Sequence, residues 1–101
     1  MSVVLVSSAQ VTVATSGSEQ RIVAANVENV VALYLSAPST NTLAISVGGS
    51  NVSTAIGVQI QKSSSLTINA PEGQYLDIYN MYVDAGTNGD KVCVSYLVKV
   101  S

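Results

Sequence analysis

The chain has 101 residues and a mass of 10.4 kDa, which suits one compact domain and leaves no room for a second. Its four basic and six acidic residues give a net charge of −2, so we expect no basic surface for phosphates and no nucleic acid partner. Histidine is absent and Cys93 is the single cysteine, which removes the usual catalytic base and excludes an internal disulfide.

The amino-acid composition favours strands over helices. Valine is the commonest residue at 17, serine follows at 15, and hydrophobic residues make up 48% of the chain, which excludes intrinsic disorder. Charged residues make up 10%, well below the roughly 25% of an ordinary soluble domain. So few charges cannot cover the surface of a free monomer, and we expect much of that surface to be covered by protein.

The N-terminal segment carries four apolar residues in a row at positions 3–6, with no basic residue before them. This run is too short for a signal peptide or a membrane span, so we expect neither, and no membrane partner. We predict that residues 1–8 form an N-terminal arm or edge strand and that residues 9–101 form one β-sandwich domain.

Apolar residues then recur with period two along most of the chain, and no stretch shows helical spacing. Clusters of Gly, Pro, Ser and Asn separate the periodic stretches, as is typical of turns. About eight short strands with frequent turns predict an all-β sandwich or barrel. The expected strands are residues 11–14, 20–25, 30–36, 43–47, 58–61, 66–68, 75–79 and 91–100.

Residues 84–90 carry the strongest turn signal, because Asn88-Gly89 suits the positive φ angles of a tight hairpin. Asp84, Thr87, Asn88 and Asp90 also supply oxygens of the kind that bind Ca²⁺. The segment lacks the alternating aspartates and the distal glutamate of a calcium loop, however. We therefore predict a hairpin here and no metal site.

Catalytic arrangements are weak throughout the chain. Cys93 has no histidine to make it a nucleophile, and Lys62 beside serines 63–65 offers a Ser–Lys dyad without an oxyanion element. Glu72 and Asp77 fall near one turn by chance rather than as a glycosidase pair. We assign no catalytic residue and no cofactor, and we expect a protein that is not an enzyme.

Residues 75–82 hold three of the five tyrosines and one of the two methionines. Tyr75, Tyr79 and Met81 share strand parity and would line one face of a strand, and Tyr and Met are common at protein interfaces. Aromatic packing inside the sandwich and a tyrosine platform for sugars remain open as alternatives. The interface candidates are Val3, Val4, Leu5, Val6, Tyr75, Tyr79, Met81 and Tyr82.

Residues 41–60 read as a strand, a Gly-Gly turn, a Ser/Thr stretch, Gly57 and an alternating apolar pair, before a further strand at residues 66–68. This pattern resembles small virion proteins of tailed bacteriophages, among them the head decoration, or cement, proteins. Over roughly residues 20–100, the resemblance implies a single-domain, jelly-roll-like β-sandwich of about eight short antiparallel strands.

The resemblance also implies a function. It predicts a non-enzymatic protein, made in the bacterial host cytoplasm, that joins the capsid exterior of a virion. There it would bind the major capsid protein as a homo-oligomer, with a trimer favoured, and stabilise the shell. A tail or head-fibre component and a lectin-like carbohydrate-binding module are the alternatives.

Overall fold

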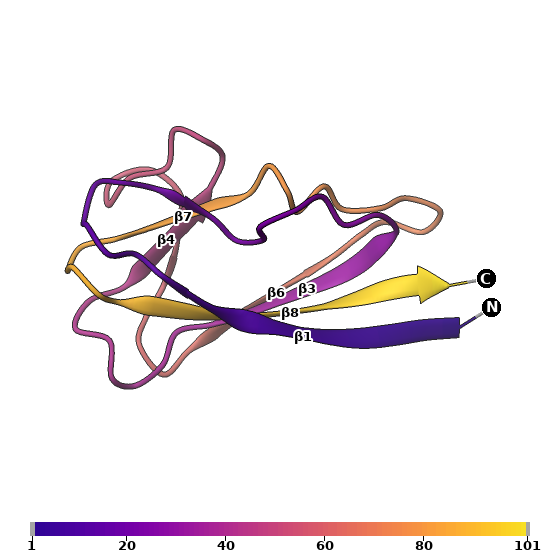
Figure 1. Ribbon diagram of the computed structural model, residues 1–101, viewed down its shortest axis with the longest axis horizontal. Helices are drawn as coiled ribbons and strands as arrows, with labels where there is room; N and C mark the ends of the chain where they lie inside the picture. The colour runs from indigo at the N-terminus through magenta and orange to yellow at the C-terminus, as the bar shows by residue number, and fades with distance from the viewer. Residues whose placement is uncertain (1, 101) are drawn as a thin grey trace.

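The computed structural model describes residues 2–100, apart from the side chains of residues 7–9. Within this range the chain forms eight strands and no helix, so the expected all-β sandwich is confirmed (Figure 1). No helix among these residues is long and apolar enough to cross a membrane. The strands are β1 (Ser2–Thr12), β2 (Gln20–Arg21), β3 (Val30–Ser36), β4 (Ile45–Gly48), β5 (Val58–Ile60), β6 (Ser65–Asn69), β7 (Tyr82–Ala85) and β8 (Lys91–Val100).

The strand order identifies the sandwich as a jelly roll. One sheet has the order β1-β8-β3-β6 and the other has the order β2-β7-β4-β5. The antiparallel pairs β1·β8, β2·β7, β3·β6 and β4·β5 match the first half of the chain against the second half in reverse order. This is the pairing of one long hairpin, with its tip between β4 and β5, rolled into two facing sheets.

The core lies between the two sheets and is built from alternate residues of their strands. In β8, Val92, Val94 and Tyr96 are buried as the alternation of this strand predicts. Each fully buried Val, Leu or Ile contributes about 1.5–3 kcal/mol of burial free energy. The largest fully buried apolar side chains are Val13, Ile22, Val30, Leu33, Leu35, Ile45, Ile78, Val83, Val92 and Val94.

Residues 84–90 do not form the expected hairpin. β7 pairs with β2 and β4 in one sheet, whereas β8 pairs with β1 and β3 in the other, so this loop crosses between sheets. Gly89 has the positive φ that the Asn-Gly signal predicts, at 88°. Its N–H donates to the Val13 carbonyl (2.8 Å), and the Val13 N–H donates to the Asp90 carbonyl (2.9 Å). These two hydrogen bonds lie where the pairing of β8 with β1 begins, and β8 does not pair with β7.

The strand expected at residues 75–79 is also absent. The segment makes one isolated bridge, between Leu76 and Val30, and then turns, with the Met81 N–H donating to the Ile78 carbonyl (3.2 Å). The alternation of apolar residues still predicts which side chains are buried, because Leu76 packs against the core and Ile78 is fully buried. The backbone leaves the ladder because it crosses from β6 in one sheet to β7 in the other.

Candidate functional site

The most unusual feature of the molecule is the free edge formed by β1. Each sheet has two edge strands, and three of the four are short: β2 has two residues, β5 has three and β6 has five. β1 has 11 residues and pairs only on its β8 side. Short edges resist pairing with other chains, whereas a long edge exposes a row of unpaired N–H and C=O groups. Strand addition is therefore favoured at β1.

The side chains of β1 increase this tendency. The strand contains no charged residue and no proline, the two features that usually protect an edge. Val3 is 50% exposed, Val4 47% and Leu5 58%, so apolar surface faces outward on both sides of the strand. β1 and β8 run side by side toward the end of the molecule where both termini lie (Figure 1).

Residues 2–8 thus lie in an edge strand that continues without a break to Thr12, with an irregular register between Ser7 and Gln10. Val6 differs from the three residues before it, because it is half-buried and packs against the core. Of the four β1 candidates, Val3, Val4 and Leu5 are the ones available to a partner.

The tyrosine cluster, residues 75–82, does not form one face of a strand as expected. Tyr75 is 51% exposed in a loop, Tyr79 and Met81 are half-buried against the core, and Tyr82 lies in β7. The guanidinium of Arg21 lies over two of the rings, 4.0 Å from the centroid of Tyr79 and 4.8 Å from that of Tyr82. The half-burial of Tyr79 and Met81 favours the core-packing interpretation for these two residues.

Sequence reasoning missed Arg21. Its guanidinium also donates to the carbonyl of Tyr79 and to Oδ1 of Asn80 (3.3 Å), which lie 58 and 59 residues along the chain. No local pattern around Arg21 could indicate partners at that separation. An isolated basic residue in a charge-poor chain was the one available signal.

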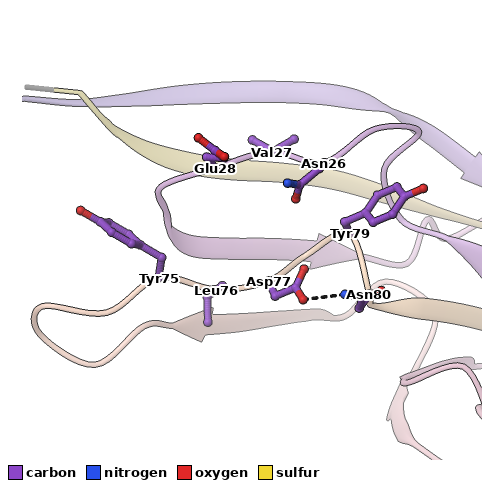
Figure 2. Close-up of a pocket in the computed structure, with 8 residues that line it drawn as sticks. All are labelled: Asn26, Val27, Glu28, Tyr75, Leu76, Asp77, Tyr79 and Asn80. Carbon is purple, nitrogen blue, oxygen red and sulfur yellow. Dashed lines mark hydrogen bonds between the residues drawn. The ribbon is translucent and has the colours of Figure 1, made fainter.

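A groove of about 480 Å³ lies beside this cluster (Figure 2). One wall comes from residues 26–28, between β2 and β3, and the other from residues 75–80, between β6 and β7. Within it, the Asn80 side-chain amide donates to Oδ2 of Asp77 (2.6 Å). The groove is lined by Asn26, Val27, Glu28, Tyr75, Leu76, Asp77, Tyr79 and Asn80.

The two aspartates that were weighed as cation ligands have structural roles. Oδ1 of Asp84 accepts the N–H groups of Gly17 (3.0 Å) and Ala85 (2.8 Å). Asp90 accepts the N–H of Thr42 on Oδ1 (2.9 Å) and the N–H of Leu43 on Oδ2 (3.0 Å). Within residues 2–100 no group of three or more His, Cys, Asp or Glu side chains is placed to hold a metal ion.

The other residues considered for catalysis have no activating partner among the residues that the structure describes. Cys93 is half-buried in β8, and its Sγ accepts a weak hydrogen bond from the amide of Gln10 (3.4 Å), which is not a base. Lys62 and Ser63 lie in an exposed turn, and Ser65 is the exposed first residue of β6. Glu72 lies in the exposed turn before Tyr75. Arg21 stacks on tyrosine rings rather than facing a nucleophile.

Comparison with known proteins returned no matching protein family, no matching curated protein and no matching solved structure.

Proposed function

We propose that this protein is a non-enzymatic virion structural protein of a tailed bacteriophage. In this proposal it is a capsid decoration, or cement, protein that binds the outer capsid surface as a homo-oligomer, a trimer, and stabilises the shell. The observation that carries the proposal is the long, uncharged, unpaired edge of β1. The jelly-roll topology supports it, because viral capsid proteins commonly use this architecture.

Burial of the exposed apolar residues of β1 against a partner would contribute favourable free energy to such an assembly. An apolar contact of about 1,000 Å² is worth roughly 25 kcal/mol before association costs, which are estimated at about 4–15 kcal/mol or more. Main-chain hydrogen bonds along a shared strand edge add directionality to that contact. Repetition of the contact over a shell adds avidity.

A trimer places a geometric demand on β1. In a closed ring of three, each contact joins two different surfaces, so β1 of one copy pairs with another edge of its neighbour. β6, at the opposite edge of the same sheet, is the next longest free edge, and its five residues also carry no charge. Pairing of β1 with β6 would join the sheets of the three copies.

The substitution Leu5→Lys tests this role of β1. A lysine on an exposed edge opposes strand addition, so we expect self-association to weaken about tenfold or more while the urea midpoint of the protomer stays unchanged. Ile56→Lys is the matched control, because Ile56 is 52% exposed but lies in the loop between β4 and β5. Sedimentation velocity measures the association, and equal effects of the two lysines would contradict the role of β1.

The same variants test the biological assignment. Wild-type protein and Ile56→Lys should co-sediment with particles assembled from the major capsid protein of the same genome and raise their disassembly temperature, whereas Leu5→Lys should do neither. Failure of the wild-type protein to bind such particles would contradict the decoration role. Binding to tail or fibre assemblies instead would place the protein there.

A further inference from the structure

The groove between residues 26–28 and 75–80 has a composition that the assembly role does not require. Tyr75 and Tyr79 stand toward opposite ends of it, with Asp77 between them and residues 26–28 along the facing wall (Figure 2). Its volume of about 480 Å³ is within the range of small-ligand sites. A groove with aromatic ends and a polar middle suits a ligand that has both apolar faces and polar edges.

The polar groups in the middle of the groove are held in place. Arg21 donates to Oδ1 of Asn80 (3.3 Å), and the amide of Asn80 donates in turn to Oδ2 of Asp77 (2.6 Å). Arg21 is itself fixed by its stacking on Tyr79 and by its bond to the Tyr79 carbonyl. Asn80 and Asp77 are thus oriented before any ligand arrives, which lowers the entropy cost of binding.

The charges around the groove disfavour an anionic ligand. Glu28 and Asp77 line it without any basic side chain in the lining, which opposes an anion such as a phosphate. The guanidinium of Arg21, which donates to Oδ1 of Asn80, offsets part of the negative charge at that end of the groove. Carboxylates accept hydrogen bonds, whereas the side-chain amides of Asn26 and Asn80 both donate and accept, and this mixture matches hydroxyl groups.

We propose that this groove binds a neutral saccharide. One sugar ring would stack on the exposed Tyr75, and its hydroxyls would bond to Asp77, Asn80 and the residues of the facing wall. Tyr79 closes the other end, with its ring stabilised by Arg21. The site is separate from the β1 edge and does not depend on the proposed assembly role.

Heteronuclear NMR titration of the full-length protein tests the proposal. The probes are the methyl glycosides of glucose, galactose and mannose, together with cellobiose and chitobiose. We expect at least one of them to shift the amide signals of residues 26–28 and 75–80 in a saturable manner, while the signals of β1 stay unchanged. Absence of saturable shifts with all five saccharides would overturn the proposal.

Two pairs of variants locate the site. Tyr75→Ala should weaken saccharide binding about tenfold, whereas Tyr75→Phe, which keeps the ring, should retain most of it. Asp77→Ala should weaken binding, whereas Glu19→Ala, which removes an exposed carboxylate outside the groove, should not. Because Tyr75 and Asp77 are exposed, both variants should fold, and the dispersion of the NMR spectrum confirms this. Equal affinity of Tyr75→Ala and wild type would contradict the proposed stacking.

Three further probes decide the ligand class. Glycerol has hydroxyls but no ring face, so its shifts should be absent or unsaturable. A sugar phosphate should bind more weakly than the neutral sugar, because Glu28 and Asp77 oppose its charge. Trilysine should not compete with the saccharide. Tighter binding of the sugar phosphate or of trilysine would overturn the assignment to a neutral saccharide.

Discussion

Replacing Asp90 with alanine is expected to lower the free energy of unfolding by about 3 kcal/mol. Asp90 is buried, and its two carboxylate oxygens accept the N–H groups of Thr42 and Leu43 (2.9 and 3.0 Å). Alanine removes two hydrogen bonds to a charged acceptor, and each such bond is worth about 1.5–3 kcal/mol. The variant therefore loosens the attachment of the loop before β4 to the start of β8.

The neighbouring Asn41 reinforces this attachment. Its side-chain amide donates to the carbonyl of Lys91 (2.7 Å) and accepts the N–H of Lys91 (2.8 Å), in the manner of a ladder pair. Asp90 and Asn41 together join the two sheets where no backbone ladder connects them.

Urea unfolding with circular dichroism measures the effect of Asp90→Ala. Asp77→Ala is the control, because the Asp77 carboxylate is exposed and its change should stay within about 0.5 kcal/mol. Asp90→Asn keeps one acceptor and should fall between wild type and alanine. A loss below about 1 kcal/mol for Asp90→Ala would show that water replaces the carboxylate at these donors.

The second large effect is expected at Gly57, where alanine should cost about 2–4 kcal/mol. Gly57 has a φ of 127°, which residues with a Cβ rarely adopt. A Cβ built there lies 2.7 Å from the Val47 carbonyl oxygen and 2.9 Å from Cγ2 of Val52. Both the backbone angle and the close contacts oppose the substitution.

Gly49→Ala provides a matched control in the same connection between β4 and β5. Its φ is not in the left-handed region, and its nearest neighbour to a Cβ is the Asn51 side chain at 3.8 Å. We expect a change within about 0.5 kcal/mol for Gly49→Ala. Thermal unfolding of the two variants compares them directly, and similar melting temperatures would contradict the strain assigned to Gly57.

The sequence predicted features that depend on neighbouring residues. The period-two pattern of β8 predicted one shared face for Val92, Val94, Tyr96, Val98 and Val100, and the first three are buried whereas Val100 is 40% exposed. The Asn-Gly pair predicted the positive φ of Gly89. Pairing partners were harder to predict, because they depend on residues far apart in the chain. The hydrogen bonds of Val13 with Gly89 and Asp90 hold the start of β8 beside β1. No local sequence pattern around Gly89 predicts these bonds.

In the candidate site, too, local features could be predicted from the sequence and long-range contacts could not. The uncharged apolar run at residues 3–6 predicted an arm or edge strand, and the structure places it in β1. The run itself does not reveal that Val6 packs against the core while Val3, Val4 and Leu5 remain exposed, because this depends on where the sandwich ends. The groove was not predicted, since its walls come from segments joined only by the fold.

Hydrogen–deuterium exchange of β1 as a function of protein concentration tests whether β1 is the edge through which the protein assembles. If β1 is this edge, its amides that face away from β8 exchange rapidly in dilute protein and slow markedly as the oligomer forms. The short edges β2 and β5 should exchange at the same rate throughout. Concentration-independent exchange along the whole of β1, with a species that stays at 10.4 kDa, would contradict assembly through β1.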